Sequence, residues 1–255
     1  MWLLYFYFVI ALFVACPLIP LLVGPILIKL SNSMSTQPDI ITIDERELPP
    51  LAAYYFRSVG PGLAAIGFKL VGYLRIERGT NNAVLFMMYL SNRDSSDLAN
   101  AVTIFTTGSR PLTVSYFEFG REFADGSELI TNNSSQPGVF ARDPSKLVFR
   151  FPGTDSPQTL WELHRKLVRK EKKFSQPFLP PAGTEIDAFR ANYGKVIETQ
   201  SRMGYFTRDG SSHNYRPTWK GACLMTWKLC WPIKQARAAL NRARTDRLLR
   251  DLYRA

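Results

Sequence analysis

The chain has few of the residues that carry most catalytic and metal chemistry. It contains 2 histidines and 3 cysteines among 255 residues. A zinc site needs clustered Cys and His ligands, and the spacing of His213, Cys223 and Cys230 does not provide such a cluster. No Gly-x-Ser-x-Gly elbow accompanies either histidine. The sequence therefore predicts no catalytic residue, no cofactor-binding residue and no metal ligand.

Three cysteines are also too few for a disulfide framework. Cys223 and Cys230 lie on one expected helix, where seven residues correspond to about 10 Å of rise. That separation is too large for a disulfide bond. We expect the cysteines to stay reduced, which favours a cytoplasmic location for the body of the chain.

Charge is missing from the first 28 residues, and Lys29 is the first charged side chain. Roughly 20 apolar residues in a helix are enough to cross a bilayer. A cleaved signal peptide has a basic start and a shorter apolar core, whereas residues 1–4 contain no Lys or Arg. A lipoprotein signal would end at Cys16 and leave a second apolar stretch exposed. The run favours a transmembrane anchor at residues 1–29, with the two cleaved signals as alternatives.

The flanking charges bear on how such an anchor is oriented. Lys29 and Arg46 follow the apolar run, and no basic residue precedes it. Cytoplasmic flanks of membrane helices are enriched in Lys and Arg. We therefore expect a single-pass membrane protein with a cytoplasmic C-terminal body.

Residues 30–47 resemble a polar linker, and residues 48–173 are predicted to form one domain. Pro49 and Pro50 are suited to the first turn of a helix through Val59. Gly60-Pro61-Gly62 is predicted to end that helix, and a second short helix is expected at residues 63–71.

From residue 72 to residue 151 the pattern is that of strands. Asp125-Gly126 provides a hairpin turn, and no helical segment separates the strands. Five or six closely spaced strands imply an antiparallel meander. The predicted fold class is α+β, with a transmembrane helix before the sheet and a basic amphipathic helix after it. The expected strands are residues 73–78, 84–90, 101–106, 112–123, 128–131 and 147–151.

A helix is predicted after the Ser156-Pro157 cap, with Leu160, Leu163 and Leu167 facing the sheet. His164 is expected on its solvated side. Residues 174–217 are predicted to be a proline-rich linker containing one short helix that begins with a capping box at Thr184.

Two polar loops contain residues that could form a site. Residues 92–100 contain Asp94 and Asp97 and are interpreted as a loop between strands, with cation binding as the alternative. Residues 204–217 are expected to form a loop that carries His213, for which a catalytic role lacks any supporting motif.

The C-terminal segment, residues 218–255, combines tryptophans with excess basic charge. Residues 233–255 contain seven basic and two acidic side chains. This pattern is typical of a helix lying in a membrane interface, and also of an amphipathic helix packed on a domain. The predicted membrane-interface residues are Trp219, Lys220, Trp227, Lys228, Trp231, Lys234, Arg237, Arg242, Arg244, Arg247 and Arg250.

These features predict a binding or scaffolding module at a membrane surface. Its expected partners are the lipid bilayer and anionic lipid head groups. One alternative is a membrane-associated hydrolase that acts on a lipid or cell-envelope substrate. A second is a nucleic-acid-associated protein, although no nucleic-acid-binding motif accompanies the basic tail.

Overall fold

The computed structural model describes residues 1–80, 83–106, 112–136, 138–171, 175–210 and 213–254, apart from the side chains of residues 3–4, 8–18, 80 and 254. The helices are α1 (Trp2–Ser31), α2 (Pro50–Ala65), α3 (Pro157–Lys170), α4 (Glu185–Arg202), α5 (Trp219–Leu229) and α6 (Ile233–Arg254), with a 3-10 turn η1 (Glu45–Glu47). The strands are β1 (Met34–Ser35), β2 (Asp39–Ile43), β3 (Lys69–Thr80), β4 (Ala83–Asn92), β5 (Asp97–Thr106), β6 (Thr113–Phe123), β7 (Glu128–Asn132), β8 (Lys146–Arg150), β9 (Pro177–Phe178), β10 (Phe206–Arg208) and β11 (Asn214–Pro217).

One long, mostly antiparallel sheet forms the centre of the molecule. Its strand order is β10-β11-β1-β3-β4-β5-β6-β7-β8, while β2 pairs with β3 and β9 pairs with β6. Among these pairs β7 and β8 run parallel. Each of the six predicted strands coincides with one of β3 to β8. The α+β meander flanked by helices is therefore confirmed, whereas the predicted antiparallel pairing is wrong for the last strand, β8.

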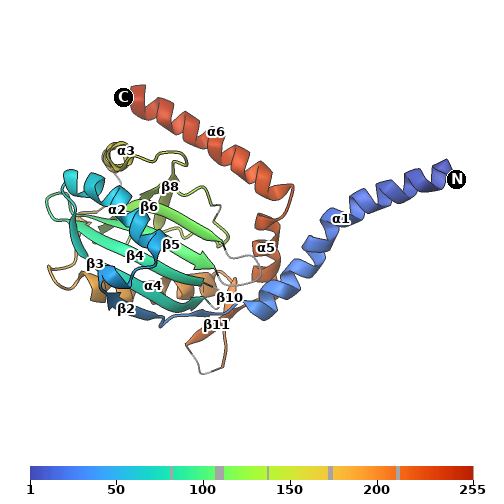
Figure 1. Ribbon diagram of the computed structural model, residues 1–255, viewed down its shortest axis with the longest axis horizontal. Coiled ribbons are helices and arrows are strands. Elements are labelled where there is room, and N and C mark those ends of the chain that lie inside the picture. Colours follow the sequence, from blue (N-terminus) through green and yellow to red (C-terminus); the bar gives the residue numbers. More distant parts are fainter. Residues whose placement is uncertain (81–82, 107–111, 137, 172–174, 211–212, 255) are drawn as a thin grey trace.

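Both faces of the sheet are covered by helices (Figure 1). Helices α2, α3 and α6 pack on one face, and α4 packs on the other. Strand β4 is buried from Phe86 to Asn92, as expected for a central strand whose residues are apolar on both sides. The side chains that meet on the α2–α3 face include Phe117, Phe119, Leu129, Leu160, Leu163 and Leu167.

The predicted helix stop at Gly60-Pro61-Gly62 is wrong, because α2 continues through Pro61 to Ala65. A β-carbon on Gly62 would lie 2.9 Å from Pro157 Cγ, so this glycine lets α2 approach the start of α3 closely. Leu63 is fully buried in the core. The expected second helix at residues 63–71 is also wrong, since β3 begins at Lys69. Tertiary packing here outweighs the local turn signal.

Segments expected to be linkers or loops add strands to the sheet. Strands β1 and β2 lie within residues 30–47, and β10 and β11 form a hairpin within residues 204–217. The hairpin pairs with β1, which pairs with β3. Helix α4 is 18 residues long, and Thr184 makes no side-chain capping hydrogen bond there. The domain boundary expected between residues 173 and 174 lies outside the described residues.

The C-terminal segment forms two helices. Helix α5 ends at Leu229 and α6 begins at Ile233. Pro232 has no backbone N–H and disfavours the helical conformation at the preceding residue, so one continuous helix is interrupted there. Helix α6 then runs back along the body, and α1 projects away from it (Figure 1).

The transmembrane helix predicted at residues 1–29 is not identified. Among the residues whose side chains the structure describes, which leave out residues 3–4 and 8–18 of α1, none of the helices combines the length and the apolar composition that crossing a bilayer requires.

Candidate membrane-facing surface

Helix α1 is joined to the body through a close contact with α5. A β-carbon on Gly24 would lie only 2.5 Å from Thr226 Cγ2, so the absence of a side chain lets the two helices approach at this point. Pro25 is buried beside this contact. One turn later, the Lys29 ammonium lies 5.3 Å from the centre of the Trp219 ring and donates a hydrogen bond to the Pro217 carbonyl oxygen. Both ends of the α1–α5 contact are therefore held by specific residues.

Helix α5 is in turn fixed to the β10–β11 hairpin. Thr218 Oγ1 accepts a hydrogen bond from the Gly221 N–H at 2.9 Å, which is a standard N-terminal cap. Gly221 touches the Tyr205 backbone so closely that a β-carbon there would lie 2.0 Å from the carbonyl oxygen. Ala222 and Met225 are buried. The helix therefore has a defined inner face, and its opposite face is left for solvent.

The outer face of α5 and the turn after it carry the predicted tryptophans: Trp219 and Trp227 lie on the helix, and Trp231 follows its end. Trp219, Trp227 and Trp231 are 56%, 53% and 61% exposed, respectively. Large exposed apolar side chains that gather on one face indicate an interaction surface. The neighbouring part of α1 is also apolar and exposed. We call this combined area the α1–α5 surface; it consists of Ile19, Leu22, Val23, Ile26, Leu27, Leu30, Trp219, Trp227, Leu229 and Trp231.

The three predicted lysines of this region have different surroundings. Lys220 and Lys234 are exposed. The Lys228 ammonium instead turns toward the body, where it donates hydrogen bonds to the carbonyl oxygens of Val139 and Phe140 at 2.9 and 2.7 Å. It also contacts the Tyr205 hydroxyl at 2.8 Å. Lys228 thus holds α5 against the body.

Helix α6 exposes basic side chains along its length, and the leucines near its C-terminal end pack on the body, whereas Leu240 is exposed. Leu248, Leu249 and Leu252 pack on the core formed with α2 and α3, and the Thr245 hydroxyl donates a hydrogen bond to the Arg150 carbonyl oxygen at 3.0 Å. Arg237 is half-buried and donates to the Gly138 carbonyl oxygen. The predicted residues that remain exposed along this helix are Lys234, Arg242, Arg244, Arg247 and Arg250.

Comparison with known proteins gives no assignment: no family model matches the chain, and no curated protein or solved structure is significantly similar to it. The function is therefore argued from the chain's own residues.

His164 belongs to a buried polar network that the sequence did not predict. The expectation that it lies on the solvated side of its helix is wrong, because it is fully buried. One ring nitrogen lies 3.2 Å from Asp97 Oδ1, and the other lies 3.0 Å from the Thr131 hydroxyl. Arg121 donates to both carboxylate oxygens of Asp97, at 2.7 and 2.6 Å. The network joins α3 to strands β5, β6 and β7.

The pKa shifts of this network follow from burial and pairing. Burial opposes the charged form of Asp97, but hydrogen bonds from His164 and Arg121 outweigh it and lower the pKa of that carboxyl. Burial lowers the pKa of His164, and Asp97 offsets this only in part. Both side chains are fully buried, so the network acts as a structural connection within the core.

In the loop at residues 92–100, polar side chains are already hydrogen-bonded to other groups of the chain. Asp97 belongs to the buried network, and Asn92 Oδ1 accepts hydrogen bonds from the Asp94 and Ser95 N–H groups. Within the described ranges, no group of three or more His, Cys, Asp or Glu side chains is placed to hold a metal ion. His213 is exposed, in the turn before β11.

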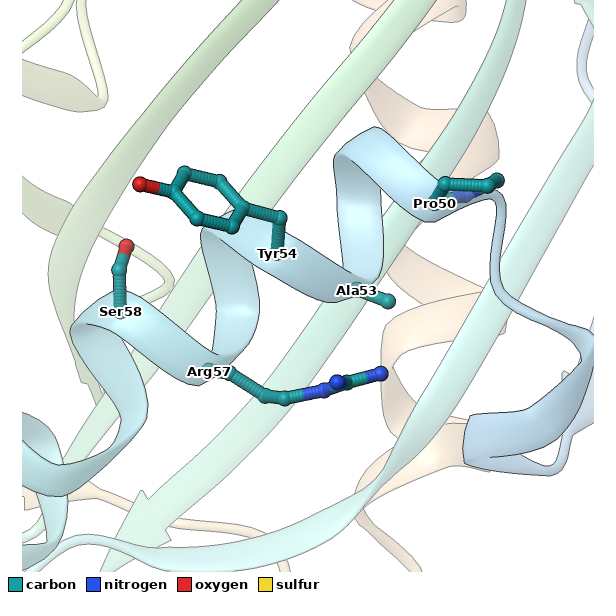
Figure 2. Close-up of a pocket in the computed structure, with 5 residues that line it drawn as sticks. All are labelled: Pro50, Ala53, Tyr54, Arg57 and Ser58. Atoms are coloured by element: carbon teal, nitrogen blue, oxygen red, sulfur yellow. The ribbon is translucent and has the colours of Figure 1, made fainter.

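An open depression of about 440 Å³ lies on the outer side of α2. Figure 2 shows Tyr54 and Arg57 pointing away from each other along the helix rather than toward a common centre. Arg57 forms an exposed ion pair with Glu45 at 3.4 Å. Ligand sites are usually concave with converging polar groups, and this depression lacks that convergence.

Proposed function

We propose that the protein is a binding or scaffolding module attached to a membrane, with α1 entering the bilayer as a single-pass anchor and α5 lying at its interface. The observation that carries the proposal is the packing of α1 on α5 at Gly24 and Thr226. Because of this contact, the uncharged N-terminal run and the exposed tryptophans belong to one part of the molecule. The part of the proposal that concerns insertion rests on the uncharged residues 1–28.

The residue types of the α1–α5 surface suit this position. Tryptophan is enriched at membrane interfaces, where its ring is apolar and its N–H can reach water. Lys220 and Lys234 are exposed and lie within three residues of Trp219 and Trp231 in the chain. Each basic residue near an anionic leaflet contributes about 1 kcal/mol of attraction. The body would then sit on the cytoplasmic side, as the positions of Lys29 and Arg46 favour.

Membrane extraction tests the insertion of α1. Full-length protein should remain with the pelleted bilayers after an alkaline carbonate wash. Its release into the supernatant without cleavage would contradict the proposed anchor.

Fluorescence tests the position of α5. Besides the α5 residues, the chain has Trp2 and the buried Trp161. In a Trp2→Phe background, brominated lipids should quench Trp219, Trp227 and Trp231 and leave the emission of Trp161 unchanged. Replacing Trp219, Trp227 and Trp231 by Phe should abolish this quenching. Replacing Leu51 and Tyr54, which are exposed on α2, should leave the quenching intact. Equal quenching in the triple Phe variant and in the Leu51/Tyr54 variant would argue against contact through α5.

Nucleic-acid binding is a second candidate, favoured by the exposed arginines of α6. Such binding would weaken steeply with salt, because it releases counterions from phosphates. Tight, salt-sensitive binding to RNA or DNA without preference for anionic vesicles would support this second candidate over the first.

A further inference from the structure

Two guanidinium groups meet beside one glycine at the junction of β8 and α6. A β-carbon on Gly138 would lie 3.2 Å from Arg150 Nη2 and 3.6 Å from Arg150 Nη1. From the other element, Arg237 Nη2 donates a hydrogen bond to the carbonyl oxygen of the same glycine at 3.1 Å. Arg150 and Arg237 therefore place two positive charges next to each other at a half-buried position.

The two guanidinium groups have more hydrogen-bond donors than the surrounding protein groups have acceptors for them. In the part of the chain that the structure describes, neither arginine forms a salt bridge with an acidic side chain. Arg237 Nη1 is buried and has no hydrogen-bond acceptor among the described residues. A buried donor without an acceptor is costly, and the cost rises when the donor carries charge.

The electrostatics agree with this geometry. Burial lowers the pKa of Arg150, Glu118 acts in the opposite direction, and the neighbouring charge of Arg237 lowers it further. Glu118 is itself poorly suited to neutralise the pair, because burial raises the pKa of its carboxyl group. A bound anion would reduce the repulsion and satisfy the unpaired donor.

We propose that Arg150 and Arg237 form a binding site for a phosphate group. Guanidinium groups donate parallel hydrogen bonds to phosphate oxygens, and two of them match the charge and the number of acceptors of a phosphate better than those of a single carboxylate. The phosphate can belong to a lipid head group or be free in solution. The lipid source rests on the proposed function: Arg237 lies near the start of α6, which directly follows the exposed Trp231.

Thermal unfolding of the full-length protein in a neutral detergent tests the site without a membrane. Inorganic phosphate should raise the unfolding temperature relative to chloride at the same ionic strength. Arg150→Gln and Arg237→Gln should each weaken the apparent phosphate affinity about tenfold or more, since each removes charged hydrogen bonds. Arg242→Gln is the matched control, because Arg242 is exposed on the same helix. It should respond to phosphate as the unmodified protein does.

Two results would overturn the site. One is the absence of any phosphate-dependent shift in the unmodified protein. The other is an equal loss in Arg242→Gln, which would indicate general screening of surface charge. If a glutamine variant fails to fold, Arg237→Lys keeps the charge but loses the forked geometry, and it should still bind phosphate more weakly than the unmodified protein.

Nanodiscs distinguish the two sources of phosphate. Phosphatidic acid in a phosphatidylcholine nanodisc should shift the unfolding temperature through Arg150 and Arg237 if the site takes lipid phosphate. A shift with inorganic phosphate but none with the lipid would assign the site to free phosphate. Protein that responds to phosphate in detergent but does not associate with bilayers would contradict the proposed function and leave the phosphate site standing.

Discussion

Gly24 on α1 and Thr226 on α5 approach so closely that a β-carbon on the glycine would lie 2.5 Å from Thr226 Cγ2. Real β-carbons essentially never lie this close to another heavy atom, so with a larger residue at position 24 either the Thr226 side chain or the two helices must shift. The contact joins an apolar helix to the helix that exposes Trp219 and Trp227 and is followed by the exposed Trp231. It therefore decides whether α1 and α5 present one surface or two separate ones.

Gly24→Ala should loosen this contact and destabilise the docking of α1. Overpacking of this kind typically costs about 1–3 kcal/mol, and it should appear as faster hydrogen exchange in α5. Adding Thr226→Ser removes the clashing methyl group and should slow the exchange again. Leu22→Ala, at an exposed position of α1, should leave it unchanged. Equal exchange in all four proteins would show that the contact does not hold the helices together.

The stability of the protein should fall as the pH is lowered from 7 to 5, because His164 is buried with a lowered pKa. The unfolded chain then takes up a proton near pH 6.5 that the folded chain binds only at a lower pH. The stabilisation is therefore present above the ordinary histidine pKa and is lost below it. Asp97, whose pKa is lowered, adds a further loss at more acidic pH.

Urea unfolding at several pH values measures this effect. His164→Gln should flatten the dependence between pH 7 and 5 and cost about 1–3 kcal/mol at pH 7, because the buried partners lose hydrogen bonds. His213→Gln is the control, since His213 is exposed. A pH dependence that disappears in His213→Gln and persists in His164→Gln would contradict this explanation.

Lys228 and Lys220 should respond differently to the same substitution. Lys228→Met leaves two half-buried carbonyl groups and the Tyr205 hydroxyl without their charged donor. It should destabilise the fold by about 1–3 kcal/mol. Lys220→Met should leave the unfolding free energy within about 0.5 kcal/mol and weaken association with anionic vesicles. Calorimetry and vesicle flotation on the two variants measure these outcomes, and similar results for both would contradict the roles given to them.

Much of the fold could be predicted from local patterns. The strands β3 to β8 show apolar runs, weak alternation or turn signals, and α3 has a serine cap followed by proline. These signals act over a few residues, so they are visible in the sequence. The path of α2 through Pro61 is different, because it depends on Gly62 fitting against Pro157, which is distant in the chain.

The candidate surface also has some features that the sequence reveals and others that depend on tertiary packing. By itself, the sequence determined the uncharged start of the chain, the spacing of the tryptophans and the basic character of the tail, since composition and period are local properties. Only the tertiary structure decided which charges are free to meet a ligand. It turned Lys228 inward, left Lys220 exposed, buried His164 with Asp97, and brought Arg150 and Arg237 together at Gly138. Such pairs arise from packing between segments far apart in the chain, so the spacing of residues in the sequence does not predict them.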